Sequence, residues 1–334
     1  MKIRLLIDAR LPGGIETHVM NLCEGLAARH HDCMIVFVRY YPDSSLYTMC
    51  QSRGISYKAC LSYRELLEFF RKDKPDIIHT HGYKANIVGR LTGLVSRAKV
   101  VSTFHSGEKP VGRLILYNWL DRWTSFFSRN IAVNSAIADR IPARIQVIPN
   151  FVDMPVSPDR IKLTSPYNVY FIGRVNPEKG PLNFCQLSTL DSEGINWHMV
   201  GGGPLLETCR EKYGEMVRFH GAVTDMDSIW PDVDMLCITS LYEGLPLVLL
   251  EAMSRGIPVV SFDVGSVRDV VDNKEYIIDK FDILEMSTCI KMHFKKSTKS
   301  RLAMSQHARS IITNNSSSAV ILPRLLAIYD ECLE

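Results

Sequence analysis

The feature that most constrains the fold is an alternation of short apolar, β-prone runs with helical patterns, which occurs in two blocks. The first block has strand-like runs at residues 2–7, 33–39, 77–80, 100–104, 131–134 and 146–148. After a proline-containing joint near 155–166, the second block has runs at 168–172, 197–200, 217–220, 233–238 and 259–262. Strands that alternate with helices form parallel sheets covered on both faces. The sequence therefore predicts an α/β protein with two Rossmann-like halves.

Length and composition agree with this prediction. A chain of 334 residues is long enough for two domains, each with its own core. No apolar run approaches the ~20 residues of a transmembrane helix. The nine cysteines form no C-x-x-C pair and mostly lie in apolar runs, a pattern typical of reduced thiols in the cytosol. The charged, strand-like start is unlike a signal peptide. We expect a cytoplasmic protein.

Charge is distributed unevenly along the chain. Residues 1–155 hold 21 Lys and Arg against 13 Asp and Glu, a net +8, whereas the remainder holds 18 against 23, a net −5. The basic first half suits an anionic partner such as a phosphorylated saccharide or a lipid surface. Zinc-ligand spacing, ribonucleoprotein motifs and helix-turn-helix signals are all lacking, so we expect no nucleic-acid partner.

A cationic loop follows the predicted strand 168–172. Gly173 ends this strand, and Arg174 and Lys179 follow before Gly180 and Pro181 start a helix. Open parallel sheets bind ligands at this carboxyl edge, where helix N-termini attract anions. Because arginine offers a planar fork and lysine a compact charge, the pair suits a diphosphate. Each cation taken alone is equally typical of a solvated turn.

Two carboxylates follow the predicted strand 233–238. Glu243 lies in the loop after the strand, and Glu251 lies inside the apolar helix that comes next. A carboxylate in such a helix needs a partner, because burying it unpaired is costly. The partner is either Arg255, one turn later, or a pair of ribose hydroxyls.

Several segments, in order along the chain, resemble family 4 glycosyltransferases with the GT-B fold. These segments are 12–18, 76–81, 101–105, 147–153, 173–180, 240–253 and 256–260. The resemblance implies two Rossmann-like domains that face a central cleft. Residues 1–155 would bind the acceptor and residues 165–315 the donor, and a last helix at 317–334 would cross back to the first domain.

The resemblance also implies an activity. The chain would be a retaining hexosyltransferase that uses a UDP- or GDP-sugar and a saccharide or lipid-linked acceptor, in the synthesis of cell-surface polysaccharide or lipopolysaccharide. The catalytic residues would be Arg174, Lys179, Glu243 and His105. The donor-binding residues would be Gly14, Gly173, Gly244, Leu245, Glu251 and Val223.

The sequence also contains one pair of aspartates that could bind a metal and three histidines that could line a site. Asp232 and Asp234 form a D-x-D pair, but they open a predicted strand, so we interpret them as strand caps and expect no metal or other cofactor. His105 either contacts the sugar or is an ordinary core or capping histidine. We expect His79 and His81 to point to opposite faces of their strand, with neither one catalytic.

Three functional alternatives remain beside the transferase. A sugar-nucleotide epimerase or a phosphorylase would share the GT-B fold, but the sequence contains no cofactor-lysine motif for a phosphorylase. A non-catalytic saccharide-binding protein would have degraded cations, whereas Arg174 and Lys179 are both present. A nicotinamide dehydrogenase is disfavoured because no G-x-G-x-x-G follows the first strand.

The segment 113–128 combines aromatic and apolar residues with arginines. Tryptophan with arginine suits a membrane interface, which would place the protein peripherally at the inner face of the plasma membrane. An aromatic stripe of this kind is also typical of a core helix. The sequence leaves both interpretations open.

Overall fold

The computed structural model describes residues 1–105, 112–156, 164–190 and 193–334, and divides the chain into two compact units. Unit 1 comprises Met1–Phe151 together with Ser318–Glu334, and unit 2 comprises Val152–Ser317. Part of the predicted joint near 155–166 lies outside the described residues. Val152 and Ser317, the first and last residues of unit 2, form a parallel β-bridge.

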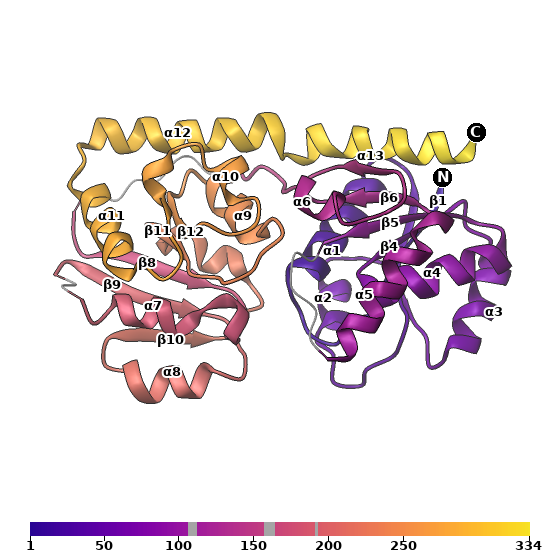
Figure 1. Ribbon diagram of the computed structural model, residues 1–334, viewed down its shortest axis with the longest axis horizontal. Coiled ribbons are helices and arrows are strands. Elements are labelled where there is room, and N and C mark those ends of the chain that lie inside the picture. The colour runs from indigo at the N-terminus through magenta and orange to yellow at the C-terminus, as the bar shows by residue number, and fades with distance from the viewer. Residues whose placement is uncertain (106–111, 157–163, 191–192) are drawn as a thin grey trace. The chain divides into compact units, whose positions relative to one another are not determined.

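Unit 1 contains a seven-stranded parallel sheet in the order β3-β2-β1-β4-β5-β6-β7 (Figure 1). Its strands are β1 (Lys2–Ile7), β2 (Asp32–Phe37), β3 (Tyr57–Ala59), β4 (Ile77–His81), β5 (Lys99–Phe104), β6 (Arg129–Ala132) and β7 (Ile145–Val147). The order along the sheet reverses between β1 and β4, which is the point where open α/β sheets bind ligands. Strand β3 is the one strand of this sheet that the sequence did not predict.

Helices cover both faces of this sheet. They are α1 (Gly14–Ala27), α2 (Leu46–Ser52), α3 (Tyr63–Asp73), α4 (Tyr83–Ser96), α5 (Arg113–Thr124), α6 (Ser135–Ala138) and α13 (Ser318–Leu333), with a 3₁₀ turn at Ser125–Phe127 after α5. The apolar core that α1 shares with α13 contains Leu5 of β1, whereas the next residue, Leu6, belongs to the core beneath α3 and α4. Adjacent residues of the strand thus contribute to the cores on opposite faces of the sheet. Helices α3, α4 and α5 lie side by side on their face (Figure 1).

Helix α13 is part of the core of unit 1, although it lies at the far end of the chain. Its side chains Leu322 and Tyr329 are fully buried. A Cβ atom at Gly25 of α1 would lie 2.5 Å from Leu322, so the glycine permits the close approach of the two helices. The hydroxyl of Tyr329 lies 2.6 Å from Nδ1 of His79 on β4. The apolar residues of 318–333 therefore pack against residues from the first half of the chain.

Unit 2 contains a six-stranded parallel sheet in the order β10-β9-β8-β11-β12-β13. Its strands are β8 (Tyr167–Ile172), β9 (Ile195–Val200), β10 (Val217–Gly221), β11 (Met235–Ile238), β12 (Val259–Phe262) and β13 (Ile277–Ile278). The order reverses between β8 and β11. Strand β13 was not predicted, because two residues are too few to show the alternation typical of a strand.

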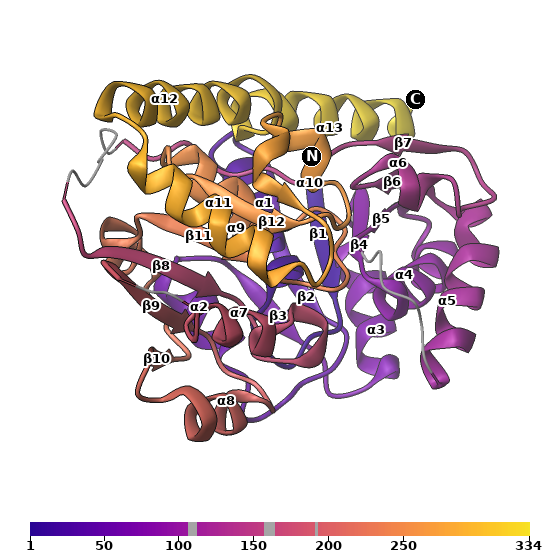
Figure 2. The same ribbon diagram turned by 60° about the vertical axis from the view of Figure 1, so that its left-hand side comes forward.

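The helices of unit 2 alternate with these strands. They are α7 (Pro181–Leu187), α8 (Leu206–Tyr213), α9 (Leu247–Ser254), α10 (Val267–Val270), α11 (Ile283–Lys295) and α12 (Thr298–Asn315). Helix α12 contacts α9, and Figure 2 shows α12 running along one side of unit 2. Pro246 is the N-cap of α9, and a short 3₁₀ turn, Pro177–Lys179, precedes α7.

Candidate functional site

The candidate site in unit 2 lies where the loops after β8 and β11 meet. The amide of Leu241 donates to the carbonyl of Glu178 over 2.8 Å, and the hydroxyl of Thr239 donates to the carbonyl of Gly180 over 2.9 Å. Gly180 has a left-handed backbone, with φ of 61°, and a Cβ atom there would lie 2.1 Å from the carbonyl oxygen of Thr239. The cationic loop can therefore rest on the acidic loop only because this residue is glycine.

This docking brings together one predicted cation and one predicted acid. Nζ of Lys179 lies 2.5 Å from Oε1 of Glu243, and the side chains keep 23% and 10% of their exposure. A charge-assisted hydrogen bond of this kind is stronger and more directional than a neutral one. The pair forms at the carboxyl edge of the sheet, where the strand order reverses between β8 and β11, which is the point at which open α/β sheets bind ligands.

Arg174 is exposed at the carboxyl end of β8. Within residues 1–105, 112–156, 164–190 and 193–334, its guanidinium forms no ion pair. The chain beside it is tightly packed, because a Cβ atom at Gly201 would lie 1.8 Å from the carbonyl oxygen of Gly173. Gly203 is equally constrained, since its Cβ atom would lie 2.4 Å from the carbonyl oxygen of Val175. Arg174 is thus a side chain available to an anion on a closely packed backbone.

Sequence reasoning missed the role of Gly201 and Gly203. The signal was present, since Gly201-Gly202-Gly203 is a run of three glycines directly after the predicted strand 197–200. Backbone φ angles of 139° and 157° at the first and third glycines show why the run is needed. It lets the loop after β9 approach the loop after β8.

Glu251 is half-buried on α9. Arg255, the partner suggested for its carboxylate, instead forms an ion pair with another residue. The guanidinium of Arg255 lies 3.1 Å from a carboxylate oxygen of Asp227 and 4.9 Å from the ring centroid of Trp230. Its one bond to Glu251 goes to the backbone carbonyl, over 3.0 Å. The simple interpretation of Arg255 as the partner of the Glu251 carboxylate is therefore not supported.

The remaining donor-side residues surround the same edge. Gly244 and Leu245 are buried between the Glu243 loop and α9, and the carbonyl of Gly244 accepts from the amide of Ser266 over 2.9 Å. Val223 follows β10 and is half-buried.

The D-x-D pair lies at the opposite, amino edge of the sheet. Asp232 accepts hydrogen bonds from the side chains of Asn168 and Tyr170, and Asp234 accepts from the amide of Asn168 over 2.8 Å. Both carboxylates thus tie β8 to the start of β11. This placement agrees with a role as strand caps.

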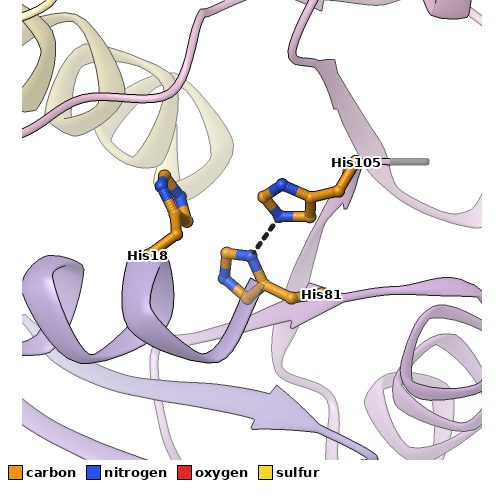
Figure 3. A group of neighbouring side chains, drawn as sticks. All are labelled: His18, His81 and His105. Atoms are coloured by element: carbon orange, nitrogen blue, oxygen red, sulfur yellow. Dashed lines mark hydrogen bonds between the residues drawn. The ribbon is translucent and has the colours of Figure 1, made fainter. Parts of the chain in front are cut away.

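The other two site residues lie in unit 1. Gly14 is the first residue of α1, directly after the β1 loop, and a Cβ atom there would meet nothing within 4 Å. His105 follows β5 and is buried beside His81 and His18 (Figure 3). Nδ1 of His81 lies 3.0 Å from Nε2 of His105.

The expectation that His79 and His81 point to opposite faces is wrong. Residues two positions apart on a strand share a face, and their ring centroids lie 4.2 Å apart. Both ring nitrogens of His79 have partners, Tyr329 and Thr103, so it is a structural core histidine.

Helix α5 has an unusual distribution of side chains. Among its described side chains only Asp121 is buried, where it pairs with buried Arg90 over 2.7 Å and accepts from Asn86 over 3.1 Å. Burial raises the pKa of Asp121 to about 6 despite the adjacent arginine. The side chain of Arg113 lies outside the described residues. A polar anchor therefore holds this helix against α4.

The opposite, outward side of α5 and its following turn is apolar and aromatic. We call this set the α5 face; it comprises Ile115, Leu116, Trp119, Trp123, Phe126 and Phe127, each more than half exposed. The interpretation of this segment as a core helix is therefore wrong. A surface of clustered large apolar groups marks an interaction site. In the part of the chain that the structure describes, no helix has both the length and the hydropathy needed to cross a bilayer.

Two family models match consecutive parts of the chain. "Glycosyltransferase Family 4" matches residues 12–155, and "Glycosyl transferases group 1" matches residues 166–293. Their boundary falls at the proline-containing joint.

Curated relatives are glycosyltransferases. A UDP-Gal:alpha-D-GlcNAc-diphosphoundecaprenol alpha-1,3-galactosyltransferase of Escherichia coli is 25% identical over 71% of this chain and 70% of its own length. The O-antigen biosynthesis glycosyltransferase WclY of the same species is 22% identical over 99% and 98%.

Solved structures share the GT-B fold of this chain. HepE of Anabaena, in complex with UDP and glucose, has a TM-score of 0.86 at 18% identity and covers 99% of this chain and 100% of its own. TarM of S. aureus, crystallised with UDP, has a TM-score of 0.77 at 14% identity, with coverage of 98% and 100%.

Proposed function

The chain belongs to glycosyltransferase family 4 and is a nucleotide-sugar glycosyltransferase, and from this we propose which donor and acceptor it uses and which roles its site residues play. The donor is a UDP-hexose. The support is that the Escherichia coli relative is named for UDP-Gal and that HepE and TarM were crystallised with UDP. The single observation that carries the residue assignment is the contact of Lys179 with Glu243 at the carboxyl edge of the unit 2 sheet, in the same loop as Arg174.

Departure of the nucleoside diphosphate is the step that the two cations serve. When the bond from the anomeric carbon to the diphosphate breaks, negative charge grows on the leaving oxygen and the sugar becomes oxocarbenium-like. Fixed positive charge at the place where this charge develops lowers the barrier. Arg174 and Lys179 supply it, while Glu251 accepts hydrogen bonds from the ribose hydroxyls. Glu243 positions the Lys179 ammonium and faces the sugar.

Transfer proceeds with retention of the anomeric configuration. The departing phosphate takes the proton of the acceptor hydroxyl, so no protein base is needed. Because two side-chain cations neutralise the diphosphate, the reaction runs without a divalent metal. We expect the rate to be unchanged in EDTA, and loss of turnover that added Mn²⁺ or Mg²⁺ restores would contradict this.

The experiment that tests the donor is a screen for slow hydrolysis. The purified chain is incubated with UDP-galactose, UDP-glucose, UDP-N-acetylgalactosamine and GDP-mannose, and the released nucleotide is measured. We expect release from one UDP-sugar, and an α-linked product by NMR once an acceptor is found. Failure of every donor to be hydrolysed or bound would contradict the proposal, and a β-linked product from an α-donor would contradict retention.

The acceptor is a saccharide on a polyprenyl diphosphate, as in the name of the Escherichia coli relative. Such an acceptor lies in a membrane, and the α5 face is suited to reach it. Tryptophan and phenylalanine side chains favour the bilayer interface, and the net +8 of residues 1–155 attracts anionic lipid. The protein therefore docks peripherally on the membrane leaflet that carries its acceptor.

Co-sedimentation with vesicles of phosphatidylglycerol and phosphatidylethanolamine tests this docking. We expect binding at low salt that weakens as salt is raised. Trp119→Ser with Trp123→Ser should reduce binding about thirtyfold or more, since each buried indole contributes more than about 1 kcal/mol. Tyr63→Ser, an exposed aromatic on α3 of the same unit, is the matched control. Absence of binding at low salt, or an unchanged double variant, would refute the role of the α5 face.

A further inference from the structure

Three histidines from separate elements of unit 1 converge in its interior. His18 lies in α1, His81 ends β4, and His105 follows β5 (Figure 3). Each offers one ring nitrogen, and the three nitrogens lie within 4.8 Å of one another. In the part of the chain that the structure describes, no other three His, Cys, Asp or Glu side chains converge in this way. We call these residues the histidine cluster.

The cluster has ring nitrogens that the surrounding protein does not satisfy. Among residues 1–105, 112–156, 164–190 and 193–334, Nδ1 of His18 and Nε2 of His81 are buried and find no hydrogen-bond partner. Neighbouring His79 differs, because Tyr329 and Thr103 occupy both its nitrogens. A buried polar atom without a partner costs free energy and calls for an ion, a water or a functional reason. Nδ1 of His18, unlike either nitrogen of His79, is therefore open to a ligand, and His81 faces His105 with its other nitrogen, Nδ1.

We propose that His18, His81 and His105 form a binding site for a zinc-class divalent cation. Three imidazole ligands with a fourth position open to water is an arrangement that Zn²⁺ adopts in proteins. Two nitrogens on one tetrahedral zinc lie about 3.3 Å apart for Zn–N distances of 2.0–2.1 Å. The 3.0 Å between Nδ1 of His81 and Nε2 of His105 is already close to that separation. Binding replaces their hydrogen bond, and the shared proton moves to the other nitrogen of the ring that held it.

Zinc at this site would inhibit the transferase. His105 cannot hold the metal and contact the donor sugar with the same nitrogen. This consequence rests on the proposed function and on the sugar contact that the family resemblance implies for His105, whereas the metal site itself does not. The two parts can fail separately, because zinc binding is measured without any sugar.

Zinc retention by the tag-free chain tests the site. The protein is loaded with ZnCl₂, passed through a desalting column, and its metal content is measured. We expect one equivalent on the unaltered chain, and loaded Co²⁺ should give the intense visible bands of a tetrahedral ion. His18→Gln and His81→Gln should each lower zinc affinity at least about tenfold. His307→Gln, an exposed histidine of unit 2, should retain the full equivalent.

Because a cluster variant could fold poorly, each is melted without zinc, and the cobalt spectrum is taken on the unaltered chain. Retention of no zinc by that chain, or full retention by both cluster variants, overturns the site. Zinc binding that leaves UDP-sugar turnover unaffected overturns only the inhibition, and with it the placement of His105 at the sugar.

Discussion

The ammonium of Lys179 lies 2.5 Å from a carboxylate oxygen of Glu243, although the two residues are 64 positions apart in the chain. The contact exists because Gly180 lets its loop rest on the carbonyl of Thr239. Without a donor, each side chain thus holds the other in place at the sheet edge. In the proposed reaction the departing diphosphate meets the ammonium of Lys179 at this contact.

Removing either cation should slow the reaction much more than it weakens the fold. We expect Lys179→Ala and Arg174→Ala each to lower kcat about a hundredfold or more, since each removes positive charge from the place where the leaving group develops its own. Steady-state kinetics with the donor found by the hydrolysis screen checks this. Lys212→Ala, an exposed lysine of α8, is the matched control. Near-normal turnover in either cation variant would refute the assignment.

Glu251 should matter for nucleotide binding and not for the position of Arg255. We expect Glu251→Gln to weaken UDP affinity about tenfold or more, because a hydrogen bond to a charged group contributes about 1.5–3 kcal/mol. Calorimetric titration with UDP measures the effect. Asp227→Asn, which removes the ion pair of Arg255, should leave UDP affinity unchanged. If the two variants behave alike, Glu251 acts through its helix and does not contact the ribose.

Two adjacent glycines should differ sharply in their tolerance of a methyl group. Gly201→Ala places a Cβ atom 1.8 Å from the carbonyl oxygen of Gly173 at a φ of 139°, so we expect a loss of about 2 kcal/mol or more in the free energy of unfolding. At Gly202 the nearest atom is a methyl carbon at 3.5 Å, and alanine there should change stability by no more than about 0.5 kcal/mol. Urea unfolding checks both. Equal stabilities would show that the loop after β9 relaxes freely.

The stability of unit 2 should fall in mild acid because of His293. Burial lowers the pKa of this histidine to about 4, and the charges of Arg301 and Lys296 add to the shift. Between pH 6.5 and 4 the unfolded chain therefore binds a proton that the folded unit does not, so the free energy of unfolding decreases as pH is lowered. The free energy of unfolding should therefore be about 2 kcal/mol lower at pH 5 than at pH 7.5 because of this histidine.

The measurement is urea unfolding at both pH values, with circular dichroism as the signal that monitors unfolding. His293→Gln lacks the titrating ring and should lose about 2 kcal/mol less than the unaltered chain over this range. An identical pH dependence in the two proteins would mean that His293 is protonated in the folded state.

The arrangement of the sheets and the edge that carries the site could be predicted from the sequence, because parallel strands bring the ends of distant runs to one edge. Lys179 and Glu243 are the clearest case. Short strands such as β3 and β13 carry too few residues to show a period. The orientation of His79 and His81 was misjudged, since the strand period of two places them on the same face. Trp119 and Trp123 could not be assigned, because an aromatic stripe looks the same in a core and at an interface.

Helix α13 has a consequence for how the chain is made. Its buried residues, among them Leu322 and Tyr329, complete the core of unit 1, yet the ribosome adds them after all of unit 2. Domains usually fold in the order in which they emerge during synthesis. Here unit 2 has its whole sequence first, and the nascent unit 1 keeps an uncovered apolar groove beside α1 until residues 318–334 arrive to close it.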